Sequence, residues 1–372
     1  MTRLILSLPA AYVIARVVWP QPWPLALKLG LAAIVLVGSQ FHLVSRLSSG
    51  SVFAPEFPRP VVVLFNVVFG AVAIATVLLL ALDVAALAAL VLTGGGWAMP
   101  PAWRDAAALA AALFAAVAVR KAVRVPPLKD IAFAIERLPP GFDGYTILHL
   151  TDLHISRLFP ARWARAVVAS ANALGADLIV VTGDFIDGSL ASRRSDVEPL
   201  GGLRARDGVW AVPGNHEYFF DHDAWMRHLA SLGIHLLGNA HTVLHRGGGA
   251  LMLAGVTDRS APATGHPGPD LEAALAGVPP GAPIVLLDHQ PANAAQAAAR
   301  GVALQLSGHT HGGMIRGLDR LVARGNAGFV SGAYRIGGMI LYVSNGTGLW
   351  PGFALRLGRP SELTRITLRP AR

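Results

Sequence analysis

A long apolar stretch fills the first third of the 372-residue chain and limits what the chain can fold into. Leu, Ala and Val dominate the sequence up to about Arg120, and a helix needs about 20 apolar residues to cross a bilayer. Charged residues make up only 14% of the whole sequence, against about 25% in an ordinary soluble domain. We therefore predict a transmembrane region over residues 1–124, with about four helices at 4–19, 25–44, 61–92 and 106–119.

The four apolar segments differ in length. The first and the last are short for a span, and the third is too long for one straight crossing. The third should tilt, extend beyond the bilayer or break near Asp83, a residue that we expect at a helix interface or near the headgroups. A cleavable signal peptide has one short apolar region, so repeated apolar segments argue against that interpretation.

The formal net charge of +9 fits either nucleic acid or anionic lipid as a partner. No run of clustered Lys and Arg interleaved with aromatic residues is present, so we favour the lipid bilayer and expect no nucleic-acid partner. Basic residues mark the cytoplasmic side of a membrane protein, and the first loop, 20–24, has none. We predict a multi-pass protein of the cell inner membrane with both termini in the cytoplasm. The basic residues behind this orientation are Arg3, Arg46, Arg59, Arg120, Lys121, Arg124 and Lys129.

After a linker at 125–144, the pattern changes to short β-branched runs that alternate with Ala-rich helical stretches and turns. This alternation is typical of an α/β domain, which we expect over residues 145–372. Strands are predicted at 145–150, 178–182, 209–212, 251–256, 284–287, 304–307, 340–343 and 363–368. Helices are predicted at 162–174, 224–232, 271–276 and 292–299.

Polar side chains suited to metal binding follow five of the predicted strands. Open α/β sheets place their ligands at the carboxyl ends of strands, so these side chains should meet at one edge. Carboxylate and imidazole ligands suit Mn, Fe or Zn, and the absence of cysteine excludes thiolate sites. Two metals about 3.5 to 4 Å apart need an anionic bridging ligand, for which Asp184 on a glycine turn is the natural candidate. The strand ends carry Asp152, His154, Asp184, Asn215, His216, His289, His309 and His311.

The ordered series DxH, GD, GNHE, a lone His and GHTH resembles the calcineurin-like metallophosphoesterase family from about residue 145 onward. The resemblance implies a four-layer α/β/β/α sandwich with two divalent metal ions, Mn, Fe, Zn or Mg. It implies that one ion is held by Asp152, His154, Asp184 and His311, and the other by Asp184, Asn215, His289 and His309. His216 would remain unligated and face the leaving group as the catalytic residue.

Further motifs near the C-terminus, residues 346–350 and 356–358, look like the membrane-associated branch of that family, which includes enzymes similar to UDP-2,3-diacylglucosamine pyrophosphatase. Two positions depart from the family pattern. Met314 stands where many relatives carry Gln, and Glu217 stands where Asp is commoner, and neither is a predicted metal ligand.

These features predict a phosphate-ester or pyrophosphate hydrolase in which two divalent ions activate water for attack on phosphorus. A phosphorylated or lipid-linked small molecule is the expected substrate, with Asn215, His216 and Arg157 as contacts. The alternatives are an enzyme for soluble substrates that uses the helices only as an anchor, and a membrane sensor without catalysis. Apolar Leu158 and Trp350 could form a lip toward the bilayer or, equally, cover the core. The oligomeric state does not follow from the sequence.

The remaining polar residues receive structural roles. Asp258 could line the pocket, and Asp187 is interpreted as a turn or cap residue. The other histidines lack ligand-like partners at strand ends and are assigned to the core or the surface: His42, His149, His222, His228, His235, His241, His245 and His266.

Overall fold

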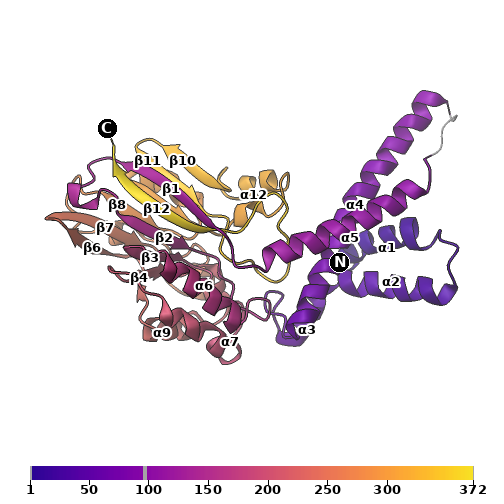
Figure 1. The fold of residues 1–372 in the computed structure, drawn as a ribbon, viewed down its shortest axis with the longest axis horizontal. Coiled ribbons are helices and arrows are strands. Elements are labelled where there is room, and N and C mark those ends of the chain that lie inside the picture. The colour runs from indigo at the N-terminus through magenta and orange to yellow at the C-terminus, as the bar shows by residue number, and fades with distance from the viewer. Residues whose placement is uncertain (1, 95–98, 372) are drawn as a thin grey trace. The chain divides into compact units, whose positions relative to one another are not determined.

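The computed structural model describes residues 2–94 and 99–371, so positions 1, 95–98 and 372 of the predicted ranges fall outside it. The chain divides into two compact units. One contains Met1–Ala122 together with Pro351–Leu357, and the other contains Val123–Trp350 together with Gly358–Arg372. Figure 1 shows that the first unit is built from helices and that the second carries the strands.

Apolar helices make up the first unit. Two of them, α4 (Arg59–Thr93) and α5 (Ala102–Ala122), are long and apolar enough to cross a membrane. A third span is possible if α2 (Leu25–Ser39) and α3 (Phe41–Ser49), which meet at 62°, form one bent crossing. The first predicted segment forms α1 (Thr2–Val13) and a short π-helix at Ile14–Val18. The structure thus shows two span-length helices within the described residues, where the sequence predicted about four.

Asp83 does not break the long helix. Helix α4 continues through it, and its carboxylate accepts hydrogen bonds from Tyr12 at 2.6 Å and from Arg16, with Arg104 3.9 Å away. These partners compensate the negative charge of Asp83, so the helix accommodates an acidic residue without interruption. The expected position at a helix interface is therefore confirmed.

The segment Pro351–Leu357 belongs to the helical unit although it lies late in the sequence. Buried Asn66 of α4 donates a hydrogen bond to the Pro351 carbonyl and accepts one from the Ala354 amide, both at 2.8 Å. Phe353 packs edge-on against Phe69 with ring centres 6.0 Å apart. This stretch of the predicted domain 145–372 therefore packs with the helices, to which an apolar ring and a matching buried amide join it.

Two six-stranded sheets form the second unit. The first sheet has the order β1-β12-β2-β3-β4-β5, and the second has the order β10-β11-β9-β8-β7-β6. The strands of the first sheet are β1 (Leu128–Ile135), β12 (Leu363–Pro370), β2 (Thr146–Leu150), β3 (Leu178–Thr182), β4 (Val209–Val212) and β5 (His235–Leu236). Those of the second are β10 (Gly332–Ile336), β11 (Met339–Val343), β9 (Leu304–Ser307), β8 (Ile284–Leu287), β7 (Gly249–Gly255) and β6 (Ala240–Arg246).

Most of the segment 125–144, which was predicted to be a linker, is structured. Residues Leu128–Ile135 form strand β1, which pairs in parallel with β12 along its whole length. A one-turn helix, Pro140–Phe142, follows and buries Phe142. The segment was misread because its partner strand lies more than 200 residues away in the sequence, and an edge strand carries a weaker apolar pattern.

Side chains alternate between two cores along the strands, as strand geometry requires. Leu251 and Leu253 of β7 lie in the core that both sheets share, while Met252 and Ala254 lie in a second core. That second core also contains residues of α10 (Leu271–Leu275) and α11 (Ala294–Ala299), so these helices cover the outer face of the second sheet. The result is an α/β sandwich with two sheets. The remaining helices are α6 (Ala161–Ala173), α7 (Leu190–Val197), α8 (Asn215–Phe219), α9 (His222–Ser231) and α12 (Asp319–Gly325).

Candidate metal centre

All seven predicted metal ligands lie shortly after strands β2, β3, β4, β8 and β9, in loops or at the first residue of a short helix. Five of them adopt positive φ angles, which are uncommon for residues with a side chain. Such strained conformations concentrate at functional sites, where the surrounding structure enforces them. The five are Asp152 (52°), His154 (46°), Asp184 (54°), His309 (68°) and His311 (50°).

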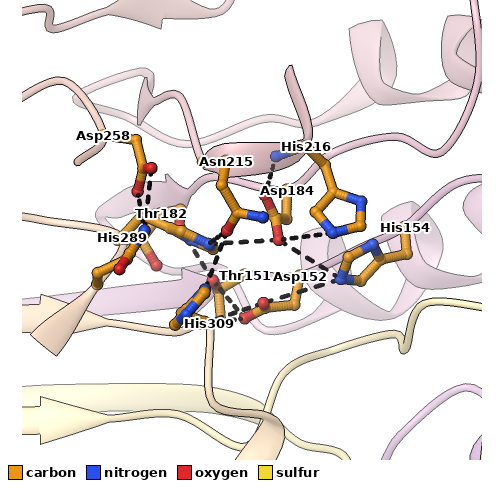
Figure 2. Close-up of polar contacts among 12 residues, drawn as sticks. Thr151, Asp152, His154, Thr182, Asp184, Asn215, His216, Asp258, His289 and His309 are labelled. Carbon is orange, nitrogen blue, oxygen red and sulfur yellow. Dashed lines mark hydrogen bonds and ion pairs between the residues drawn. The ribbon is translucent and has the colours of Figure 1, made fainter. Parts of the chain in front are cut away.

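One group of ligands gathers around the imidazole of His154. Its Nε2 atom lies 3.1 Å from Nε2 of His311 and 3.7 Å from Oδ2 of Asp184. Oδ1 of Asp152 lies 3.6 Å from Nε2 of His311. The donor atoms of Asp152, His154 and His311 thus lie close together. Figure 2 shows Asp152 and His154 there beside Asp184.

A second group forms on the other side of Asp184. Nε2 of His289 lies 3.1 Å from Oδ1 of Asn215 and 3.3 Å from Oδ2 of Asp184. Nδ1 of His309 lies 2.9 Å from the same Asn215 oxygen (Figure 2). The Oδ2 atom of Asp184 therefore takes part in both groups, as a bridging carboxylate must.

The hydrogen bonds show that these groups suit cations. Nδ1 of His289 lies 2.6 Å from the Thr182 carbonyl, which can only accept, so Nδ1 carries the hydrogen. In the neutral ring, Nε2 then presents a lone pair to the oxygens of Asn215 and Asp184. Acceptors that face acceptors need a positive charge between them. The residues present therefore fit two divalent metal ions, whose usual bonds to nitrogen and oxygen are about 2.0 to 2.2 Å long.

The electrostatics of the protein chain alone agree with this fit. Burial by itself would lower the pKa of His289, but the negative charges of Asp184 and Asp152 raise it well above its usual range. Burial would likewise raise the pKa of Asp184, but His289 and His216 hold it well below the usual range. The pocket stabilises positive charge next to Asp184, whether a proton or a metal ion carries it.

His216 has a partner that sequence reasoning missed. Buried Asp187 accepts a short hydrogen bond from Nδ1 of His216 through Oδ1 and contacts Nδ1 of His154 at 3.0 Å through Oδ2. Burial opposes protonation of His216, but Asp184 and Asp187 overcome it and raise the pKa of His216 to about 9. Asp187 is therefore a positioning residue for two site histidines and not merely a turn residue. The available signal was its spacing, three residues after Asp184 in the same strand-end loop.

Glu217 joins the loops that carry the ligands. Its carboxylate accepts backbone hydrogen bonds from Gly214 at 2.7 Å, Phe185 at 2.8 Å and Asp184 at 2.9 Å. The substitution of Glu for the commoner Asp thus keeps a carboxylate in a structural role. A hydrogen bond to a charged group typically stabilises a fold by about 1.5 to 3 kcal/mol. The three hydrogen bonds to Glu217 therefore fix the turn around Asp184.

Three further residues that the sequence singled out, Asp258, Arg157 and Leu158, differ in burial and in contacts. Asp258 is buried and accepts hydrogen bonds from Gln290, the neighbour of His289, at 3.0 and 3.1 Å. Arg157 is exposed in the loop that follows His154, and its role in substrate binding stays a prediction. The apolar lip is wrong for Leu158, which is fully buried. The adjacent Phe159 is also buried and packs on Trp163.

Gly308 offers a test of how tightly the centre is packed. A Cβ atom at this position would overlap Oγ1 of Thr151 and Oδ2 of Asp152, so Gly308→Ala should displace a predicted metal ligand. We expect weaker metal binding and a loss of roughly 1 to 3 kcal/mol in unfolding free energy, as overpacking of a close-packed interior costs. The control is Gly325→Ala at the end of α12, where a Cβ would have no neighbour within 4 Å. Equal metal content and melting temperature in both variants would contradict the tight packing inferred here.

Comparisons with known proteins agree with the geometry. A family model described as calcineurin-like phosphoesterase matches residues 145–313. The chain is 34% identical to a protein of Danio rerio named transmembrane protein with metallophosphoesterase domain, over 70% of this chain and 61% of that protein. It is 32% identical to an uncharacterized metallophosphoesterase of Helicobacter pylori, over 66% of this chain and 64% of that protein.

A Bacillus subtilis protein, the uncharacterized metallophosphoesterase YkuE, is 30% identical over 62% of this chain and 82% of its own length. By contrast, the chain spans less than two thirds of the Danio rerio and Helicobacter pylori proteins. The chain belongs to the calcineurin-like metallophosphoesterase family.

Proposed function

We propose that the chain hydrolyses phosphate-ester or pyrophosphate bonds with two divalent metal ions, one held on each side of Asp184. The observation that carries the proposal is the shared Oδ2 atom of Asp184, which lies within 3.7 Å of His154 Nε2 and 3.3 Å of His289 Nε2. When bound, two such ions neutralise phosphoryl oxygens and activate a water for in-line attack. The seven proposed ligands and His216 are buried or nearly so, which strengthens the electrostatic interactions among them.

The chain itself supplies the proton donor. His216 follows the proposed ligand Asn215 directly, and its backbone amide donates to Oδ1 of Asp184 at 2.9 Å, so its ring is fixed beside the metal groups. Because Asp187 accepts from Nδ1, a proton on Nε2 is the one that the ring can give to a leaving oxygen. Asn215 and Arg157 complete the proposed contacts to the substrate phosphate.

For the substrate we propose a phosphate or pyrophosphate carried on a lipid, at the cytoplasmic face of the inner membrane. Two span-length helices and a relative whose name includes the word transmembrane support membrane anchoring. A membrane anchor raises the encounter rate with membrane-embedded substrates without any change in the site. The second candidate is a soluble phosphodiester or phosphomonoester, for which the helices act only as an anchor.

A pair of matched substrates separates the two candidates. The full-length protein, reconstituted with Mn²⁺ in vesicles, would be offered a long-chain lipid pyrophosphate and a short-chain analogue with the same headgroup. Lipid preference predicts a higher kcat/KM for the embedded substrate, and the preference should vanish for detergent-dispersed protein. Equal values for both substrates in vesicles would favour the soluble candidate and would leave the hydrolytic chemistry itself intact.

The orientation can be tested independently of the substrate. The charged loops predict that a reporter fused after residue 372 reads as cytoplasmic and that one inserted at 20–24 reads as external. The measurement is a paired fusion of alkaline phosphatase and a fluorescent protein at each position. If both signals are reversed, the metal centre faces the opposite compartment, and substrates restricted to the cytoplasm are excluded.

A further inference from the structure

A second kind of metal-ligand cluster lies outside the residues that the centre uses. It consists of His222 and Asp223 in the first turn of α9 and of His266 in the loop after β7. Oδ1 of Asp223 lies 2.9 Å from Nδ1 of His222 and 3.4 Å from Nε2 of His266. Donor atoms that share a metal ion with bonds of about 2.0 to 2.2 Å lie at about this separation from one another.

The hydrogen bonds around His266 set its tautomer. The hydroxyl of Thr264 donates to the Ala261 carbonyl at 2.9 Å, and its oxygen lies 3.1 Å from Nδ1 of His266. A hydroxyl has one proton, so Nδ1 of His266 must supply the hydrogen of the second contact. In the neutral ring, Nε2 then points a lone pair at the carboxylate of Asp223. In this form the two acceptors need a cation or a second ring proton between them, as His289 and Asp184 do in the candidate metal centre.

Neighbouring rings hold the two imidazoles in place. The phenol ring of Tyr218 stacks on His222 with centres 4.3 Å apart and an angle of 8°. The rings of His222 and His266 are 4.7 Å apart, and Tyr218 also contacts His266 edge-on at 5.4 Å. Metal-binding histidines typically have the second ring nitrogen hydrogen-bonded, as Thr264 does here for His266. The cluster is thus oriented before any ion binds.

From this geometry we propose that His222, Asp223 and His266 form a third metal site. Its two histidines and one carboxylate would bind a divalent cation such as zinc. Three protein ligands leave one coordination position for water or for an anion. The carboxylate of Asp223 is 63% exposed, so the position opens to solvent. The site joins the start of α9 to the loop after β7, and it shares no ligand with the centre around Asp184.

Metal counting on the full-length protein tests the site. Wild-type protein and His266→Gln would be stripped with chelator, dialysed against Zn²⁺ at pH 8 and analysed by inductively coupled plasma mass spectrometry. We expect His266→Gln to bind one zinc ion fewer per chain than the wild type. The matched control is His245→Gln, which changes an exposed histidine of β6 and should bind as much zinc as the wild type.

A second variant keeps the test decisive if His266→Gln folds poorly. Asp223→Asn removes an exposed carboxylate, keeps the side-chain shape and should also lose one zinc ion. With Co²⁺ as the probe, both variants should lose the same component of the visible absorption spectrum, while His245→Gln keeps it. Equal zinc content and identical cobalt spectra in wild type and Asp223→Asn would overturn the proposal, and the cluster would then be a hydrogen-bonded contact only. Because the readout is a difference between variants, it does not depend on occupancy around Asp184.

Discussion

Replacement of Asp184 by Asn is expected to remove activity more completely than any change at a ligand of a single ion. The carboxylate oxygen that lies between His154 and His289 would become part of a neutral amide, so both proposed ions lose their shared anionic ligand. Changes in partners that only orient the ligands typically cost 10- to 100-fold in affinity or activity, and this change should exceed about 100-fold. Metal content, measured by mass spectrometry, and turnover should fall together.

Two comparisons make the Asp184→Asn result specific. His311→Gln alters a proposed ligand of one ion only and should retain the other ion. Asp130→Asn, at an exposed carboxylate of β1 that pairs with Arg365, should change neither metal content nor rate. Near-full metal content and rate in Asp184→Asn would show that Asp184 does not bridge the two groups.

His216→Ala should leave the proposed metal ligands in place and still slow turnover. Its proposed task is to give a proton to the departing oxygen, a contribution that is typically worth about 100- to 10,000-fold. The loss should be largest for alkyl esters, whose leaving groups need a proton, and small for activated aryl esters. The measurement is kcat for both ester classes, together with metal content. An equal loss for both classes would assign His216 to phosphate positioning instead.

The pH dependence gives the same residue a second readout. In the chain alone, nearby Asp184 and Asp187 raise the pKa of His216 to about 9, so the proton is present at neutral pH. A raised pKa means that the acid form is lost only as the pH rises through that value, and the rate for alkyl esters should fall there. Cations bound to Asp184 oppose its negative charge and shift this fall to lower pH. His216→Ala should lack the fall altogether.

The gathering of the proposed ligands in space could be predicted from sequence because each of them lies within a few residues of the end of a short apolar strand. The predicted bounds of β3, β4, β8 and β9 agree with those observed, and parallel strands bring their carboxyl ends to one edge. The structure then brings together all seven predicted ligands in two groups. Local patterns were sufficient here because strand, turn and ligand lie within a few residues of one another.

Features that depend on distant partners could not be predicted in this way. Strand β1 is defined by β12, and the segment Pro351–Leu357 is defined by a buried amide on Asn66, nearly 300 residues earlier. His222 and His266 looked like isolated surface histidines, since only the fold brings their rings to 4.7 Å. The contacts of Asp187 with two histidines could not be predicted either, because an acidic residue in a glycine-rich loop is also a common turn residue.

The most direct test of the two-metal account is the rate of phosphodiester hydrolysis by the purified full-length protein. The protein would be stripped of metal, assayed with an aryl phosphodiester, reloaded with Mn²⁺ and assayed again, with Asp184→Asn treated in parallel. The account predicts no hydrolysis by the stripped protein, recovery on addition of Mn²⁺ to the wild type, and no recovery in Asp184→Asn. Hydrolysis that survives metal removal, or that Mn²⁺ restores equally in Asp184→Asn, would contradict it.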